Sequence, residues 1–399
     1  MKNCKAVNLV SCNSRHLCLL LTAFLFAASC FSQITLNIII DKFPQNSASD
    51  SFFVAGNFNN WNPGNLEFKT LKSDKGLLIQ LKGLTANNYE FKITKGNWNT
   101  VECDNNGNEI GNRKINLSAD TTIFCSVKNW KDNFKQTPKK HTASVNVQIL
   151  DTAFLMPELN STRRIWLYLP KDYASSKKRY PVIYMQDGQN IFDEYTSAYG
   201  EWRVDECLDS LITTGAQASI VVGIDNGPNR LTEYNPFDND KFGKGQGDAY
   251  IDFLVNTLKP FIDRTYRTMA SKEHTIIAGS FMGGFISYYA ALKYPNQFGK
   301  AGIFSPSFWI ASEIEKFTDS LGPDLNGKYF FYVGENEGRE MVDDMVAIQE
   351  KIGKNSSAVI YSLIDPTGFH NEPTWAKWFS EFYKWILAKG FNVITNAED

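Results

Sequence analysis

The stretch that decides the fold is Ile277-Ala278-Gly279-Ser280-Phe281-Met282-Gly283-Gly284. An apolar, strand-like run over residues 274–278 leads into it, and glycines flank the residues that follow. Glycine has no Cβ, so a chain can turn sharply at such a place although the backbone is crowded. The pattern predicts a strand, a tight turn with Phe281 at its tip, and a helix.

The same alternation extends over the C-terminal two thirds of the chain. Amphipathic stretches at residues 250–261 and 374–388 favour helices. Strand-like runs occur at residues 164–169, 181–185, 219–224, 274–278, 301–304, 329–333 and 358–363. Alternating strands and helices are typical of a mainly parallel sheet with helices on both faces. We therefore predict an α/β domain over residues 143–392.

Five segments, in the same order, carry a family resemblance. They are Arg163-Arg164-Ile165-Trp166-Leu167-Tyr168-Leu169-Pro170, Tyr184-Met185-Gln186-Asp187-Gly188-Gln189-Asn190, Gly200-Glu201-Trp202, the turn quoted above, and Gly368-Phe369-His370-Asn371-Glu372. The domain resembles the esterase D family, which includes feruloyl and siderophore esterases, over residues 144–387. The resemblance implies an α/β-hydrolase fold and the hydrolysis of carboxylic esters by a nucleophilic serine.

Phe281 stands where that family places its nucleophilic serine. A phenyl ring has no oxygen for attack and no proton to give, so the catalytic position lacks its nucleophile. Ser280 is one residue early and is expected to be buried beneath the turn. A recent natural loss, an engineered substitution and a sequencing change all remain open as the origin of Phe281.

The resemblance assigns the remaining catalytic roles to residues that are present. His370 matches the general base, and Glu337 matches the acid that orients it, with Glu335 as the fallback. The oxyanion hole would use the backbone N–H of Met282 and one from the turn containing Gly188 and Gln189. Backbone donors do not depend on the side chain at position 281.

The N-terminal part has a different texture. Short strand-like runs at residues 36–40, 52–55, 77–81, 89–93 and 121–124 are separated by Asn, Gly and Asp turns, which predicts a small all-β sandwich over residues 33–130. Residues 131–142 lack apolar periodicity and indicate a linker.

Two segments of the sandwich, Phe53–Pro63 and Tyr89–Trp98, resemble starch-binding and glycogen-binding modules. The resemblance implies that Trp61 stacks on glucose rings and that Lys92 completes the site. Strict spacing would put the second aromatic at Val101, so Trp98 either replaces it or covers the core. A packing role for Trp61 also remains open.

Residues 1–32 have the basic, apolar, small-residue order of a secretory signal peptide, with cleavage expected before Gln33. A lipoprotein anchored to a membrane through Cys30 is the alternative. We accordingly expect a secreted or periplasmic protein.

Composition limits the other partners. Basic and acidic residues nearly balance, at 41 and 43, so nothing indicates nucleic acid. Without a CxxC pair or a histidine cluster, neither a metal site nor another cofactor is expected. Cys103 and Cys125 share one small module, and a disulfide between them stays open.

The sequence thus leaves three hypotheses. The first is a secreted serine esterase that removes acyl groups from a polysaccharide, brought to it by the sandwich but lacking its nucleophile. The second is a non-catalytic glycan-binding protein with a relic hydrolase domain. The third, a siderophore esterase, is disfavoured because it would have no use for a sugar-binding module. The partner is accordingly an α-glucan or an acylated glycan.

Overall fold

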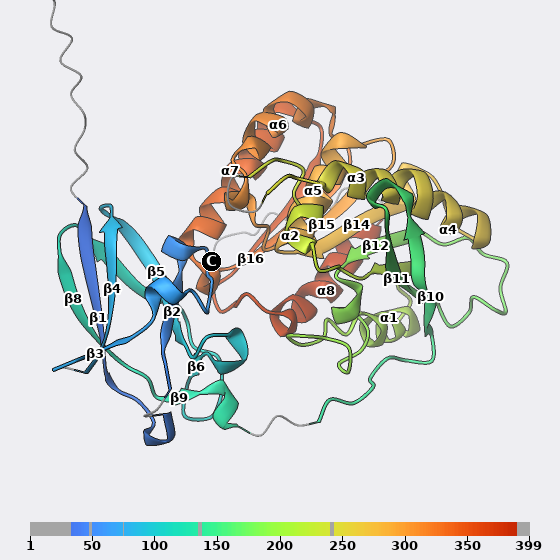
Figure 1. The fold of residues 1–399 in the computed structure, drawn as a ribbon. Coiled ribbons are helices and arrows are strands. Elements are labelled where there is room, and N and C mark those ends of the chain that lie inside the picture. The colour runs from blue at the N-terminus through green and yellow to red at the C-terminus, as the bar shows by residue number, and fades with distance from the viewer. Residues whose placement is uncertain (1–32, 48–49, 75, 135–137, 240–242, 389–399) are drawn as a thin grey trace, which may run out of the picture.

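The structure, a computed structural model, describes residues 33–47, 50–74, 76–134, 138–239 and 243–388 (Figure 1). Strands dominate the N-terminal part, and strands alternate with helices in the C-terminal part. The two parts lie side by side, and residues 138–146 run along the lower edge of the C-terminal part (Figure 1).

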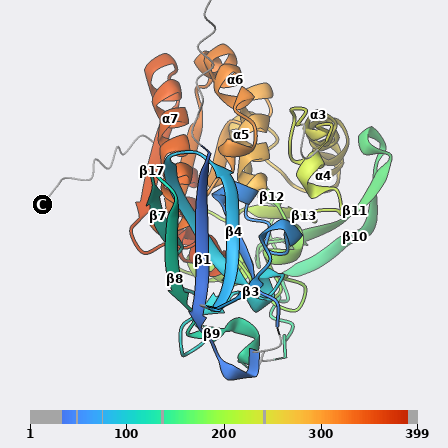
Figure 2. The same ribbon diagram turned by 60° about the vertical axis from the view of Figure 1, so that its left-hand side comes forward.

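The N-terminal part is built mainly from two antiparallel-rich sheets, with strand orders β3-β4-β1-β8 and β2-β5-β7 (Figure 2). β1 also pairs in parallel with β8. Inward side chains of both sheets share one apolar core, which contains Ile38, Ile79, Val54, Phe91 and Trp130. The strands are β1 (Ile34–Lys42), β2 (Phe53–Gly56), β3 (Leu71–Ser73), β4 (Gly76–Leu84), β5 (Asn87–Thr94), β6 (Glu102–Cys103), β7 (Arg113–Leu117), β8 (Thr121–Ser126) and β9 (Asn129–Trp130).

The C-terminal part has one eight-stranded mixed sheet in the order β10-β11-β13-β12-β14-β15-β16-β17. Neighbours from β13 to β17 pair in parallel, whereas β11 is antiparallel to both β10 and β13. The strands are β10 (Val147–Met156), β11 (Ser161–Tyr168), β12 (Val182–Gln186), β13 (Ile220–Ile224), β14 (Thr275–Ser280), β15 (Lys300–Phe304), β16 (Lys328–Gly334) and β17 (Val359–Asp365).

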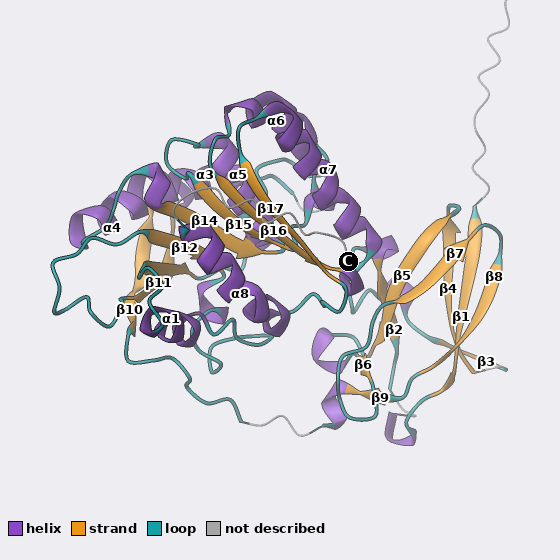
Figure 3. Cartoon of the chain, turned by 180° about the vertical axis from the view of Figure 1, so that it is seen from behind, coloured by secondary structure: helices purple, strands orange, loops and turns teal. Residues whose placement is uncertain are grey.

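Helices cover both faces of this sheet (Figure 3). One apolar cluster joins one face to α3, α4, α5, α6 and α7, and a second cluster joins the other face to α1 and α8. The helices are α1 (Val204–Thr213), α2 (Arg230–Glu233), α3 (Gly247–Asp252), α4 (Lys259–Thr265), α5 (Met282–Lys293), α6 (Glu313–Leu321), α7 (Arg339–Asn355) and α8 (Glu372–Leu387). The five residues of β12 are all buried, as expected of a parallel strand covered on both sides.

Several elements depart from the sequence expectations, and strands β3, β6, β7 and β9 of the N-terminal part were not predicted. Strand β10 was not predicted. It is an edge strand whose side chains are mostly exposed or half-exposed, and its irregular pairing with β11 around Asp151 interrupts the alternation of its apolar residues. The helix expected at residues 250–261 is present, but residues Phe253–Leu258 form π-helical turns between α3 and α4.

Candidate active site

Strand β14 passes into helix α5 through one residue, Phe281, whose φ and ψ are 55° and −118°. A positive φ is strained for so large a side chain. The turn is also crowded, because a Cβ on Gly279 would lie 2.7 Å from the carbonyl carbon of Gly283. We call this strand–turn–helix the elbow. Its geometry presents the side chain of residue 281 at the carboxyl end of β14.

The half-buried Phe281 ring lies against His370. The two ring centroids are 4.9 Å apart and the planes meet at 86°. Trp309 and the guanidinium of Arg230 flank the same ring, at 6.3 Å and 5.8 Å from its centroid. A side chain at the tip of the elbow is therefore in direct contact with the imidazole. Ser280, in contrast, is the buried last residue of β14.

His370 and Glu337 form a close pair, with 2.7 Å between Nδ1 and Oε2. Glu337 follows β16 and His370 lies in the loop between β17 and α8. The Glu337 side chain is fully buried, whereas that of His370 is 36% exposed. Because Nδ1 faces the carboxylate, Nε2 is turned away from it and is available to a partner. Glu335 is exposed, so Glu337 is the acid that the fold brings to the imidazole.

Hydrogen bonds fix the Glu337 carboxylate from behind. Its Oε1 accepts hydrogen bonds from the Ser305 hydroxyl and the Gly334 amide, both at 2.7 Å. The Trp375 indole N–H donates to Ser305 Oγ at 2.9 Å. The Trp375 ring also lies edge-on to His370, with centroids 5.0 Å apart. The base and its acid are thus held by three further groups, which is how a catalytic pair is kept in one geometry.

The turn after β12 lies next to the elbow. A Cβ on Gly283 would lie 2.9 Å from the Cβ of Gln186 and 3.0 Å from Oδ2 of Asp187. Gly188 and Gln189 form the short 3-10 turn that follows, and Met282 is the first residue of α5. First-turn amides of a helix have no partner within that helix. The fold therefore brings together the two backbone segments assigned to the oxyanion hole.

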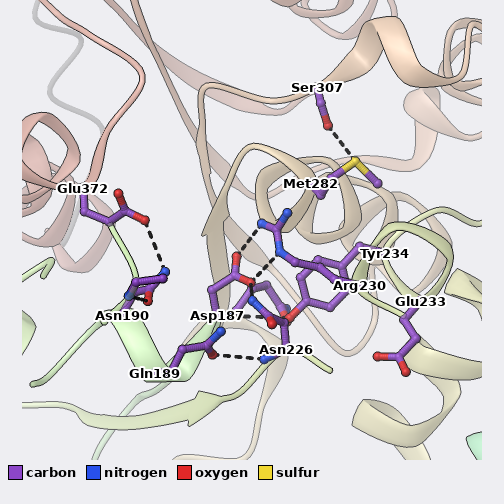
Figure 4. A network of polar contacts seen from close by, with 12 residues as sticks. Asp187, Gln189, Asn190, Asn226, Arg230, Glu233, Tyr234, Met282, Ser307 and Glu372 are labelled. Carbon is purple, nitrogen blue, oxygen red and sulfur yellow. Dashed lines mark hydrogen bonds and ion pairs between the residues drawn. The ribbon is translucent and has the colours of Figure 1, made fainter. Parts of the chain in front are cut away.

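A polar network holds the turn after β12 (Figure 4). Arg230 donates to both carboxylate oxygens of Asp187 at 2.7 Å, and the Asn226 amide donates to Oδ1 at 2.6 Å. Gln189 Oε1 in turn accepts from the Asn226 backbone N–H at 3.1 Å. Asp187 has a positive φ of 59°, and the network offsets that strain.

Glu372 is a second buried carboxyl beside the pair. Its Oε1 accepts a hydrogen bond from the Asn190 amide at 3.2 Å. Burial raises the pKa of Glu372 to about 7, against the lowering effect of the nearby His370 and Arg230 charges. The proton state of this group therefore changes near neutral pH.

Sequence reasoning did not single out Arg230, Ser305, Trp375 or Asn226. Each comes from a loop or helix far along the chain from the residue it supports, as with Ser305 and Glu337, which are 32 residues apart. Ser305 is marked in the structure by a positive φ, but this is a property of the backbone that the sequence does not show.

The N-terminal part carries an aromatic pair. The half-buried rings of Trp61 and Trp98 lie 6.4 Å apart, with 37° between their planes. Asn60 and Trp61 both have positive φ, at 50° and 55°. Asparagine tolerates this conformation, whereas tryptophan is strained in it. The backbone strain at Trp61 therefore lowers stability while it fixes the position of the indole.

Lys92 lies in a different setting from the two indoles. It is 7% exposed, and its Nζ is 2.6 Å from Oε1 of Glu109. The other Glu109 oxygen accepts a hydrogen bond from the Asn371 side chain at 2.6 Å. Asn371 directly follows His370, so this ion pair joins the β-rich part to the loop of the base. Glu90 makes a second contact, accepting a hydrogen bond from the Arg339 amide at 3.4 Å.

Cys103 and Cys125 are both buried and are separate thiols. Burial raises the pKa of Cys103 to about 11. The expected signal peptide, residues 1–32 with Cys30, lies outside the described residues. Within the described ranges, no helix is both long and apolar enough to span a membrane.

A family model and several sequence relatives match this chain. The sequence model of the Esterase family matches residues 156–381. The uncharacterized protein YbbA of Bacillus subtilis is 29% identical over 250 residues, which are 57% of this chain and 93% of YbbA. An endo-1,4-beta-xylanase/feruloyl esterase of Xylanibacter ruminicola is 27% identical over 49% of this chain. That match spans about a quarter of the xylanase/feruloyl esterase, 26% of its length.

A solved structure extends the comparison to the fold. The enterobactin esterase FES of Shigella flexneri superposes with a TM-score of 0.52, over 89% of this chain and 92% of its own. At 13% sequence identity the likeness is one of fold alone. With the family match covering more than half of the sequence and the sheet order of an α/β hydrolase, the chain belongs to the Esterase family.

Proposed function

We propose that this chain carries the site of a carboxylic-ester hydrolase for acylated polysaccharides, and that Phe281 leaves it without hydrolytic activity. The observation that supports this most strongly is the His370–Glu337 pair, held 2.7 Å apart against the residue at the tip of the elbow. A buried acid in contact with an imidazole, which in turn contacts the tip of an elbow, are the parts of an acyl-transfer site.

A serine at position 281 would complete the chemistry. His370 Nε2 would accept the hydroxyl proton as the oxygen attacks the ester carbonyl. Glu337 would hold the imidazole in the correct tautomer and stabilise its positive charge. The backbone N–H of Met282 and one from the turn at Gly188 and Gln189 would donate to the oxyanion. His370 would then return the proton to the leaving alcohol.

Phe281 blocks this sequence in two ways. It offers no nucleophilic atom. Its ring also contacts the imidazole in a T-shaped arrangement, with ring centroids 4.9 Å apart. A water molecule would have to replace the hydroxyl while the phenyl ring occupies the position beside the base. The oxyanion hole alone supports only modest rates.

The polysaccharide part of the proposal rests on the N-terminal aromatic pair. The half-buried indoles of Trp61 and Trp98 come from two turns and lie next to each other, and sugar rings stack on indole faces. The relative from Xylanibacter ruminicola joins a xylanase to a feruloyl esterase in one chain, which favours an acylated glycan as substrate. A glycan-binding part would raise the local substrate concentration at the hydrolase domain.

Restoring the hydroxyl tests the catalytic part of the proposal. Phe281→Ser should hydrolyse aryl acetates and feruloylated oligosaccharides at least about 10³-fold faster than the unmodified chain. The control is Phe281→Ser with His370→Ala, which should return to the rate of the unmodified chain. A folded but silent Phe281→Ser variant would contradict the proposal, and so would His370-dependent turnover by the unmodified chain.

A second candidate is a non-catalytic glycan-binding protein, and Phe281 itself favours it. This function predicts that the unmodified chain binds an acylated oligosaccharide without turnover. Calorimetric titration with feruloylated and unacylated forms of one oligosaccharide measures the contribution of the acyl group. Equal, unhydrolysed binding by Phe281→Ser would favour this candidate over the esterase.

We also propose export, from the order of residues in the leader. The intact mass of the protein made in a bacterial host should begin at Gln33. A diacylglyceryl group on Cys30 would instead show a lipoprotein, and a retained Met1 would contradict both.

A further inference from the structure

Three carboxylates gather where the chain enters helix α1. One carboxylate oxygen from each of Glu201, Asp205 and Glu206 lies within 4.8 Å of the other two. Glu201 is 6% exposed and Asp205 is fully buried, whereas the Glu206 side chain is 30% exposed. The group is apart from the elbow in sequence and has no part in the chemistry proposed above.

Residues 142–144, at the C-terminal end of the linker and just beyond it, hold one oxygen of each buried carboxylate. The Thr142 hydroxyl donates to Oε2 of Glu201 at 2.8 Å, and the Ser144 amide donates to Oδ2 of Asp205 at 2.6 Å. The opposite oxygens, Glu201 Oε1 and Asp205 Oδ1, are buried without a hydrogen-bond partner among the described residues, as is Glu206 Oε2. Buried acceptors in native proteins nearly always have a partner. Three orphan oxygens in one place indicate a ligand.

The charge of the group points the same way. Of these three carboxylates, only Glu206 has a cationic partner among the described residues. That partner is Arg203, at 3.3 Å. Repelling carboxylates this close need either shared protons or a cation between them.

We infer that Glu201, Asp205 and Glu206 bind a calcium ion. The donors are all oxygens, which suit a hard cation and exclude the preference of zinc for nitrogen and sulfur. Magnesium usually keeps most of its waters and takes one or two carboxylates, whereas calcium accepts several carboxylates in flexible geometry. The partly exposed Glu206 leaves room for the waters that complete the coordination. An all-carboxylate site has no Cys or His spacing, so the sequence carried no signature of it.

A cation here would fasten the linker to the hydrolase domain. It would tie residues 142–144 to α1 through the two carboxylates that they already bond. Trp202, next to Glu201, packs on Trp375 with ring centroids 5.7 Å apart. The Trp375 indole donates a hydrogen bond to Ser305, and Ser305 donates one to Glu337. The three carboxylates are thus linked to Glu337 through Trp202, Trp375 and Ser305.

The test is calcium binding by the EDTA-stripped whole chain at about pH 8, where free carboxylates are ionised. Isothermal titration with calcium chloride should show one site. At a calcium concentration about 100 times the measured Kd, the Tm should rise by about 5–10 °C relative to EDTA. Magnesium at the same concentration should give a clearly smaller shift. An equal magnesium shift would overturn the assignment to calcium.

Two isosteric variants locate the site. Asp205→Asn and Glu201→Gln keep the hydrogen bonds to Ser144 and Thr142, and each should weaken calcium binding at least about tenfold. In EDTA they should melt at or above the unmodified chain, since they relieve repulsion. Asp209→Asn is the matched control: it lies on the same helix and bonds Asn146 and Tyr168, so it should lower Tm yet keep the calcium shift.

Two results would overturn the inference, and the first of them needs no variant. The first is the absence of both binding heat and a Tm shift up to about 10 mM calcium, a concentration about ten times the Kd of the weakest natural calcium sites. That result would mean that protons shared between the three carboxylates, and not a cation, reduce their repulsion. The second is a calcium shift that survives in a folded Asp205→Asn/Glu201→Gln double variant, which would place the ion elsewhere.

Discussion

The two halves of this protein present their candidate sites in opposite ways. The hydrolase site is built from residues that follow parallel strands of the sheet, and several hydrogen bonds hold its acid in place. The glycan site is built from two half-buried indoles on turns of a small β-rich part. The first kind of site has a fixed geometry in which one side chain, Phe281, decides the chemistry. The second depends on exposed area, where each residue contributes a little.

The comparison also shows where the halves meet. The Lys92–Glu109 pair of the β-rich part contacts Asn371, next to the base. A residue expected to bind sugar is thus placed in the interface with the hydrolase domain. Its burial favours a structural role, which experiments can separate from ligand binding.

The largest expected effect is on the acid of the hydrolase site. In the Phe281→Ser background, Glu337→Gln should lower kcat by about 10³–10⁴-fold, because the imidazole loses the carboxylate that orients and stabilises it. Ester hydrolysis rates measure this. Glu335→Gln is the matched control and should change little, since Glu335 is exposed. A reversed order would mean that the fixed geometry of the buried site is wrong.

Glu372 should make stability depend on pH. Its carboxyl ordinarily has a pKa of 4.5, raised to about 7 in the fold mainly by burial. The folded state therefore holds more protons between these values, so stability should fall as pH rises through them, by up to about 3 kcal/mol, and level off above. Glu372→Gln, which still accepts from Asn190, should make this slope shallower, because it removes the contribution of this one carboxyl. Urea unfolding of both proteins at several pH values measures the difference, and parallel curves would contradict it.

Lys92→Met should lower the stability of the β-rich part and should affect glucan binding less. The change leaves the partly buried Glu109 without its ion partner, which we expect to destabilise the β-rich part by about 1–2 kcal/mol. Urea unfolding measures the loss, and Glu109→Gln in the same chain should recover part of it. Unchanged stability together with lost glucan binding would instead make Lys92 a ligand residue.

Trp61→Ala should have the smallest effect on free energy but a clear one on function. Losing one stacking face costs about 1 kcal/mol, which weakens α-glucan binding about fivefold or more. Retardation in native gels containing starch measures this. Phe124→Ala is a suitable control, because Phe124 is 59% exposed on β8 in the same part of the chain. Equal retardation of the Trp61→Ala and unmodified proteins would make Trp61 a packing residue.

Much of the fold could be predicted because its strands and turns are local patterns. Apolar runs located β12 through β17, and the glycines at 279 and 283 located the elbow. The edge strand β10 could not be found in this way, since its irregular pairing with β11 interrupts the alternation of its apolar residues. The sequence offered both Glu335 and Glu337 as the acid, and burial after β16 separates them.

The sequence by itself determined the order of the elements, the position of the elbow and the absence of a hydroxyl at its tip, because each is written in consecutive residues. Only the tertiary structure decided which groups meet across the chain: Glu337 with His370 and Ser305, Lys92 with Glu109, and the carboxylates of Glu201, Asp205 and Glu206 with one another. Such contacts depend on how packed strands and helices bring distant segments to one place. The spacing of residues in the sequence does not fix that distance, so it had to come from the fold.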